Sequence, residues 1–312
     1  MNYSTKELTQ IIKNKALSLG FNGIGISKAE KLIGFEDSLK DWIKLGYNAN
    51  MDYMTRNAEK RVDPTILVQG AKSVISLIVS YYPQKVQPAE LPQISKYAYG
   101  TDYHFVLKDK MQLLWNFIKE YIPELDGRMF VDSAPVSDKR CAVKSGLGWL
   151  GKNSCLINKE HGSFIFICEL IINIELDYDE PYNSNFCGSC TKCIDACPTN
   201  AIVQPGVIDS KRCISYQTIE NKEETIPEEF TGKFKNRIFG CDICQDVCPW
   251  NKKPTITKIG EFTPSEDLFT LDLPAWKSMT KEEFNKLFRK TPLKRAKYSG
   301  LQKNITFISK TE

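Results

Sequence analysis

The spacing of apolar residues along the first 178 residues predicts helices alternating with strands. The segment STKELTQIIKNKALSLG has an apolar stripe at helical spacing, begins with the capping-box pair Ser4 and Glu7, and ends at Gly20. By the same periodicity, further helices are expected at 35–46 and 105–122, and strands at 21–27, 73–82, 128–134 and 164–176. The pattern indicates an α+β or α/β domain around a central sheet, and it does not reveal the order of the strands.

From about residue 180 to 255 this periodicity fades, and cysteine and proline become frequent. The run CGSCTKCIDACP (187–198) has the spacing C-x2-C-x2-C-x3-C-P, in which bacterial ferredoxins give three thiolates to one [4Fe–4S] cluster and the fourth to a neighbouring cluster. A second run, FGCDICQDVCP (239–249), holds only three cysteines, and Cys213 between the runs completes the eight that two clusters need. The spacing therefore predicts a two-cluster, ferredoxin-like module.

In such modules each cysteine run gives ligands to both clusters, and this crosswise pattern divides the eight cysteines into two sets of four. The first cluster takes Cys187, Cys190, Cys193 and Cys248, and the second takes Cys197, Cys213, Cys241 and Cys244. A pair of structural zinc sites is the alternative, although zinc ribbons rarely use this spacing. The remaining Cys141, Cys155 and Cys168 are expected to be core thiols.

Composition and charge narrow the class of protein. The length of 312 residues is enough for about two domains, and 42% hydrophobic residues is ordinary for a globular protein. The net charge is only +4, so the protein as a whole is not a polycation. Its N-terminus has no apolar signal core and no twin arginine, and the most apolar run, 164–174, is too short to span a bilayer and contains Glu169. We expect a monomeric cytoplasmic protein without membrane contact, in which the high cysteine count reflects metal binding and not disulfides.

Local charge points to a polyanionic partner. Between Lys277 and Lys303 there are nine Lys and Arg against two Glu, a local balance of +7. Such clusters suit nucleic-acid phosphates, although a solvated face of the amphipathic segment KEEFNKLFRK explains part of the charge equally well. The candidate contacts are Lys233, Lys235, Arg237, Lys290, Lys294, Arg295 and Lys297.

Three stretches of the first domain are candidates for a site. GLGWLG (146–151) matches a dinucleotide fingerprint, but it follows a helical segment and precedes a strand-like one, the reverse of the required context. In DYHFVL, Asp102 is expected to cap a helix, and His104 is not proposed as a cobalt ligand. Asp132 ends an apolar strand, where it suits general acid catalysis or an ordinary turn equally well.

Taken together, several stretches resemble the epoxyqueuosine reductase family of tRNA-modifying enzymes. They are MDYMTRNAEKR, YAYGTDYH, VDSAPVSDKRCAVKSGLGWLGKNSCLI, CGSCTKCIDACPTNAI, RCISYQTIE and FGCDICQDVCPWN, and they cover nearly the whole chain. The resemblance implies a nitroreductase-like α/β domain that holds base-off cobalamin against the two-[4Fe–4S] module, with Asp132 as proton donor. By motif position it places around the corrinoid Arg56, Tyr97, Asp132, Asn153, Ser154, Leu156, Ser215, Tyr216 and Asp242.

The reaction so implied is reduction of epoxyqueuosine to queuosine at the wobble position of tRNA. Cob(I)alamin attacks the epoxide, and a low-potential donor that the sequence does not identify supplies electrons through the clusters. A cobalamin-dependent reductive dehalogenase and a plain ferredoxin-type electron carrier are the alternatives. The expected domains are 1–178 for cobalamin and catalysis, 179–255 for the clusters, and a basic helical 256–312, which lacks the HEAT-like repeats of many members.

Overall fold

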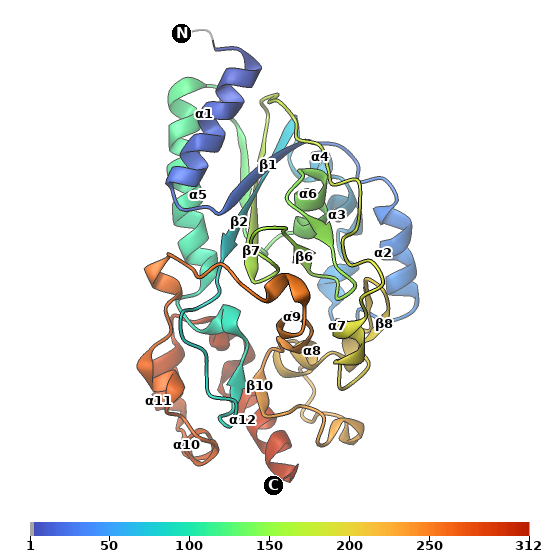
Figure 1. Cartoon of the computed structure of the whole chain (residues 1–312), viewed down its shortest axis with the longest axis vertical. Helices are drawn as coiled ribbons and strands as arrows, with labels where there is room; N and C mark the ends of the chain where they lie inside the picture. The colour runs from blue at the N-terminus through green and yellow to red at the C-terminus, as the bar shows by residue number, and fades with distance from the viewer. Residues whose placement is uncertain (1–2, 312) are drawn as a thin grey trace.

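The computed structural model describes residues 3–311, and one half of it is built on a four-stranded antiparallel sheet (Figure 1). The strand order is β1-β2-β7-β4, with bounds Gly23–Lys28, Ser73–Ser80, Ile165–Ile172 and Gly127–Phe130. Strand β7 is central, and its Glu169 lies opposite Ser76 of β2 and Phe130 of β4. The sheet joins strands far apart in sequence, which the hydrophobic pattern alone did not reveal.

Helices cover both faces of this sheet. Helices α1 (Thr5–Ser18) and α5 (Tyr103–Tyr121) pack on one face, and α6 (Asp138–Lys144) packs on the other (Figure 1). The predicted capping box of α1 is confirmed, since the Ser4 hydroxyl accepts from the backbone N–H of Glu7 at 3.3 Å and the Glu7 carboxylate accepts from the N–H of Ser4 at 2.9 Å. Asp102 caps α5 as expected.

The glycine-rich segment 146–151 forms a tight turn between helix and strand. It follows α6 and leads into the ladder of β5 (Trp149–Leu150) with β6 (Leu156–Ile157). Gly146 has φ +72°, and a Cβ there would lie 2.5 Å from the backbone oxygen of Glu180. This context differs from the strand–turn–helix of a dinucleotide site, as the sequence indicated.

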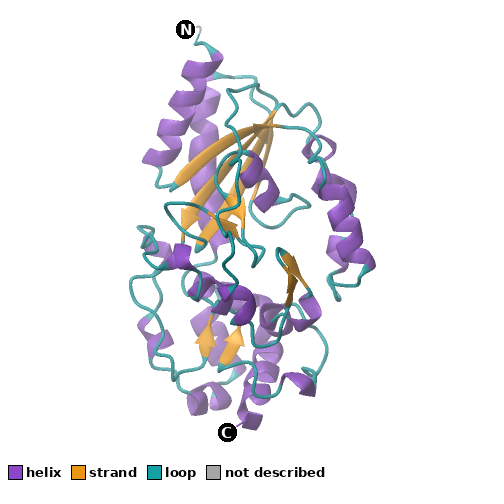
Figure 2. Ribbon diagram, turned by 45° about the vertical axis from the view of Figure 1, so that its right-hand side comes forward, coloured by secondary structure: helices purple, strands orange, loops and turns teal. Residues whose placement is uncertain are grey.

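Three short helices flank the sheet, and the remaining elements form the other half of the molecule (Figure 2). The flanking helices are α2 (Phe35–Lys44), α3 (Ala58–Val62) and α4 (Pro64–Leu67). The second half contains α7 (Lys192–Asp195), β8 (Ile202–Gln204), β9 (Val207–Ile208), α8 (Ile214–Ile219), β10 (Arg237–Phe239), α9 (Ile243–Asp246), α10 (Leu273–Ser278), α11 (Lys281–Phe288) and α12 (Lys297–Ile308). The mixed helix and strand content agrees with the predicted α+β class.

The second half has its own apolar core. It includes the fully buried Trp276, Phe234 and Phe239, and it joins the cysteine-rich segment to the C-terminal helices. Strand β3 (Gln93–Ile94) pairs in parallel with β10, so this part of the N-terminal sequence also contributes to the second core. Within residues 3–311, no helix has the length and apolar character to cross a membrane.

Candidate iron–sulfur and catalytic site

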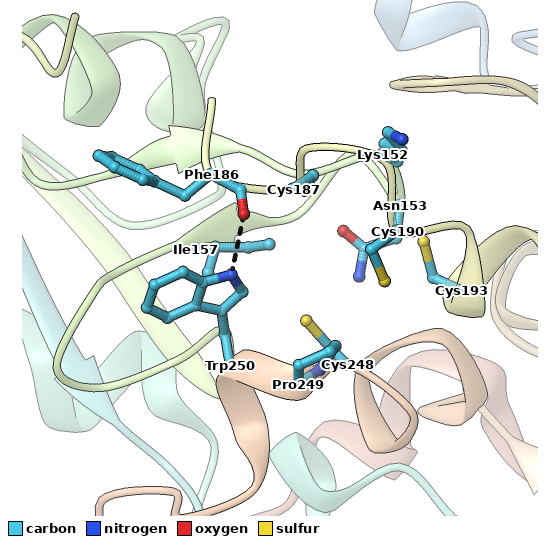
Figure 3. A pocket seen from close by; sticks show the side chains of 10 residues that line it. All are labelled: Lys152, Asn153, Ile157, Phe186, Cys187, Cys190, Cys193, Cys248, Pro249 and Trp250. Atoms are coloured by element: carbon cyan, nitrogen blue, oxygen red, sulfur yellow. Dashed lines mark hydrogen bonds between the residues drawn. The ribbon is translucent and has the colours of Figure 1, made fainter. Parts of the chain in front are cut away.

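Four cysteines from both sequence runs surround one cavity. Cys187, Cys190, Cys193 and Cys248 line a space of about 270 Å³ together with Lys152, Asn153, Ile157, Phe186, Pro249 and Trp250 (Figure 3). The Trp250 ring closes one side, where its Nε1 donates to the backbone oxygen of Phe186 at 3.4 Å. The structure thus brings together the four cysteines that the spacing assigned to the first cluster.

The other four predicted ligands also lie near one another. Cys213 interacts electrostatically with Cys197 and Cys241, and Cys244 interacts with Cys241 and Cys213. Cys213 stands at the start of α8, and Cys244 lies in α9. Burial raises the pKa of the Cys241 thiol to about 12, and coordination to a metal ion would favour its thiolate form.

The arrangement suits an iron–sulfur cluster better than a single metal ion. Among the described residues, no three His, Cys, Asp or Glu side chains converge closely enough to hold one ion. Instead, four thiols face a cavity of about 270 Å³, which has room for a multi-atom cluster.

Asp132 is held in an unusual backbone conformation just after β4. Its φ is +49°, in the left-handed region, and its side chain is exposed. The hydroxyl of Tyr103, in the first turn of α5, donates to Asp132 Oδ2 at 2.6 Å. Burial and the charge of Asp132 raise the pKa of Tyr103, so the phenol remains protonated and acts as a donor.

A pair of carboxyl groups, Glu169 and Asp138, lies close enough to Asp132 to interact with it electrostatically. Glu169 is fully buried on β7, and neither of its side-chain oxygens accepts a hydrogen bond from a described donor. The Asp138 side chain, at the start of α6, lies beside it, and two neighbouring buried carboxyl groups are stable when one of them keeps its proton and donates it to the other. Burial raises the pKa of Asp138 to about 7 and moves the pKa of Glu169 well above its usual range.

Several residues that the resemblance assigned to the corrinoid lie where the two halves meet. The Tyr97 ring is 6.1 Å from that of Phe239 in β10, and the Asn153 amide is 3.5 Å from the backbone oxygen of Cys244. The Tyr216 hydroxyl accepts from the backbone N–H of Asn50 at 3.2 Å.

The remaining assigned residues differ in their surroundings. Arg56 is exposed, Ser215 is half-buried in α8, and Ser154 has φ +61°. The Leu156 side chain is only 2% exposed and packs in an apolar cluster, so only its backbone can face a ligand. The Asp242 carboxylate accepts from the backbone N–H of Lys96 at 2.8 Å.

The predicted phosphate contacts divide into free and engaged side chains. Among these candidates, the exposed lysines that form no ion pair with a described residue are Lys233, Lys235, Lys290, Lys294 and Lys297, of which Lys294 interacts electrostatically with Asp102. Arg295 forms an ion pair with Glu220 at 2.6 Å and interacts electrostatically with Asp132. Arg237 is half-buried and lines a small cavity beside Cys241 and Asp242.

The sequence analysis missed three residues of the site. No sequence pattern marked Tyr103, which directly follows the helix cap Asp102. Lys96, half-buried and paired with Asp242 and Asp246, looked like an ordinary loop lysine. Glu169 was visible as the single acid within FIFICELIINI, a signal that was used only to argue against a membrane span.

Comparison with known protein families first shows to which class of protein the chain belongs. A family model described as "4Fe-4S double cluster binding domain" matches residues 186–251, which contain all eight predicted ligands. The two-cluster module predicted from the spacing is thereby confirmed. The chain is an iron–sulfur protein that joins an α+β sheet domain to a double-cluster module.

A second family model and the relatives identify the family. The model "Epoxyqueuosine reductase QueG, DUF1730" matches residues 61–133. An epoxyqueuosine reductase of Cyclobacterium marinum is 51% identical over 96% of both chains. The chain belongs to the epoxyqueuosine reductase family and is an oxidoreductase.

Solved structures agree with this assignment. An epoxyqueuosine reductase in complex with an epoxyqueuosine-modified tRNA-Tyr stem loop has a TM-score of 0.88 at 32% identity, covering 98% of this chain and 81% of that one. The Bacillus subtilis enzyme, with its catalytic aspartate loop swung out of the active site, has a TM-score of 0.90 at 31% identity and covers 98% and 82%.

Proposed function

We propose that this protein reduces epoxyqueuosine to queuosine in tRNA, using cobalamin and two [4Fe–4S] clusters. The observation that carries the proposal is the 51% identity to an epoxyqueuosine reductase along nearly the full length of both chains. The related structure bound to a modified tRNA stem loop supports tRNA as the substrate, and the exposed lysines around Lys290 and Lys294 supply charge for phosphate contacts.

Each cluster has a ligand set of four cysteines. The first takes Cys187, Cys190, Cys193 and Cys248, and the second takes Cys197, Cys213, Cys241 and Cys244. Support comes from the cavity that the first set lines and from the mutual interactions within the second. The clusters carry single electrons from a low-potential donor toward the substrate.

The junction of the two halves is the proposed place of the cobalamin. Tyr97, Asn153 and Tyr216 lie where loops of the sheet domain meet the cluster module, which suits a flat cofactor held between the halves. Bound in its base-off form, the cofactor supplies low-potential chemistry at the epoxide carbon.

Asp132 supplies one of the two protons of the reaction, and solvent supplies the other. Reduction of the epoxide to an alkene consumes two electrons and two protons and releases the oxygen as water. The Asp132 carboxyl gives a proton to the oxygen as its C–O bond breaks, and the carboxylate left behind accepts the hydrogen bond of Tyr103. The relative whose catalytic aspartate loop swings out of the active site supports this role for the loop after β4.

Expression in a bacterial strain that lacks its own epoxyqueuosine reductase tests the proposal. Mass spectrometry of tRNA nucleosides should show epoxyqueuosine replaced by queuosine when the parent chain is expressed. Asp132→Asn should leave epoxyqueuosine in place, whereas Asp109→Asn, at an exposed position of α5, should behave as the parent. Persistent epoxyqueuosine despite folded, cluster-loaded parent protein would reject the proposed substrate.

A further inference from the structure

Three aromatic rings form a stacked column that starts at the sheet and ends at the start of α5. The Tyr103 ring lies nearly parallel to that of Phe166 in β7, with centroids 4.2 Å apart and an angle of 11° between the planes. The His104 ring stacks on the same Tyr103 ring, with centroids 4.2 Å apart and an angle of 29°. Two rings this close to a third cannot share one of its faces, so Tyr103 lies in the middle and His104 is the outer end of the column.

Asp102, the cap of α5, fixes the orientation of the outer ring. The His104 Nδ1 donates to the Asp102 carboxylate at 2.7 Å, and the same carboxylate oxygen accepts from the backbone N–H of His104 at 3.1 Å. The His104 side chain is 25% exposed, so part of the ring is open to a ligand. A ring held in place before binding loses little conformational entropy when a ligand stacks on it.

A structural role for the His104 ring does not account for this arrangement. The cap of α5 uses the backbone N–H of residue 104, which almost any residue type would supply. The buried side chains of Tyr103, Val106 and Leu107 anchor the first turn of α5 in the apolar core. The start of the helix therefore does not depend on the His104 ring.

The column is connected both to the proposed proton donor and to the basic C-terminal segment. The hydroxyl of Tyr103, the middle ring, donates to Asp132 Oδ2 at 2.6 Å. The backbone N–H of Asp102 donates to the backbone oxygen of Lys290 at 2.7 Å, so the segment with the exposed Lys290 and Lys294 lies against the start of α5 (Figure 1). Proteins hold unpaired nucleotides with this combination, in which a flat ring stacks on the base and cations bind the phosphates.

We propose that the His104 ring is a stacking platform for a nucleobase of the tRNA anticodon loop. The inference rests on the proposed function and names a residue that contacts its substrate. Because His104 and Asp132 are both in contact with Tyr103, a base stacked on His104 is brought close to the proton donor. Lys290 and Lys294 then bind the neighbouring phosphates.

Photocrosslinking tests the contact directly. Anticodon stem loops that carry 5-iodouridine at one loop position at a time are bound to the cluster-loaded parent protein and irradiated, and mass spectrometry of the digested protein locates the crosslinks. For at least one loop position the crosslink should fall on His104, because iodouracil reacts with an aromatic ring that stacks on it. Bound stem loops that give no His104 crosslink at any loop position would overturn the inference.

Filter binding of the epoxyqueuosine-containing stem loop measures the size of the effect. His104→Ala should weaken binding roughly 5- to 150-fold, which is the effect of losing one base–aromatic stack, whereas His104→Phe keeps a flat ring and should stay much closer to the parent. Phe117→Ala is the matched control, because it removes a half-buried ring of α5 about 20 Å along the helix from His104. Equal binding by His104→Ala and the parent, or equal weakening in Phe117→Ala, would overturn the inference.

The salt dependence of binding separates stacking from charge. Stacking releases no counterions, so the slope of log K against log salt should be the same in His104→Ala as in the parent, and a smaller slope would overturn the inference by showing a phosphate contact instead. If the cluster-loaded parent binds no stem loop, the tRNA substrate of the proposed function fails and the inference fails with it. If the parent binds the stem loop and His104→Ala binds it equally well, the inference alone fails.

Discussion

The hydrogen bond from Tyr103 to Asp132 makes the sharpest prediction about catalysis. In Tyr103→Phe the ring and its stacking on Phe166, with centroids 4.2 Å apart, are kept, and only the hydroxyl is lost. A hydrogen bond to a charged acceptor contributes about 1.5–3 kcal/mol, and this bond is strongest when Asp132 has become a carboxylate by giving up its proton. The variant should therefore slow the chemical step roughly 10- to 150-fold.

The backbone at Asp132 adds to this effect. A left-handed conformation at a residue other than glycine costs about 1–2 kcal/mol, so the loop needs contacts that hold it in place. Without the Tyr103 hydroxyl, the population of loops with Asp132 in position should fall.

Single-turnover conversion of epoxyqueuosine-containing tRNA under anaerobic conditions measures the rate. Tyr99→Phe is the matched control, because Tyr99 is also buried and its hydroxyl accepts a long hydrogen bond of 3.3 Å from the N–H of Gln87. A rate in Tyr103→Phe equal to that of the parent, with the clusters loaded, would refute the assigned role of this hydrogen bond.

Three further predictions concern the clusters, the buried carboxyl pair and the basic surface. Cys197→Ser should lower the iron content by roughly half, because it removes a ligand of the second cluster only, and iron analysis with absorption spectroscopy measures this. Folding raises the pKa values of the Glu169–Asp138 pair, so its stabilising effect is present at low pH and is lost as pH rises toward about 7. The free energy of unfolding, measured by denaturant titration at a series of pH values, should therefore fall in the parent by up to about 1.4 kcal/mol per pH unit more than in Glu169→Gln. Replacing Lys290 and Lys294 by Ala should weaken tRNA binding and lower its salt dependence by about one unit of slope for each lost phosphate contact, as measured by filter binding.

Each of these three predictions has a matched control and a result that would contradict it. Cys141→Ser should retain the full iron content, and an equal loss there would point to general destabilisation instead of ligand removal. Parallel pH curves for the parent and Glu169→Gln would contradict a shared proton. Lys119→Ala, at an exposed position near the end of α5, should leave tRNA binding unchanged, and equal weakening there would deny the basic region a specific role.

Local signals carried much of the fold prediction. The capping box at Ser4 and the apolar run around Leu77 predicted α1 and β2, because both depend on side chains close together in the chain. The sheet order β1-β2-β7-β4 and the β3–β10 ladder depend on contacts between distant segments, for which periodicity holds no information.

For the site as well, residues marked by a local pattern were predicted, and contacts between distant residues were not. Cysteine spacing predicted the cluster sets because short loops around a cluster impose short intervals, and Cys213 was found by counting. The Tyr103–Asp132 contact joins residues that are 29 positions apart, and it leaves no spacing pattern in the sequence. Glu169 is an intermediate case. A single acid within a buried strand indicates an unusual environment for that carboxyl group, but the sequence does not identify Asp138 as the residue beside it.

One measurement tests the central claim most directly. Purified protein with both clusters loaded is incubated anaerobically with cobalamin, a low-potential reductant and tRNA bearing epoxyqueuosine, and the nucleosides are analysed by mass spectrometry. The account predicts a nucleoside lighter by one oxygen atom, formed only when cobalamin and the clusters are both present and nearly absent in Asp132→Asn. Conversion that is independent of cobalamin, or no conversion by fully loaded protein, would contradict it.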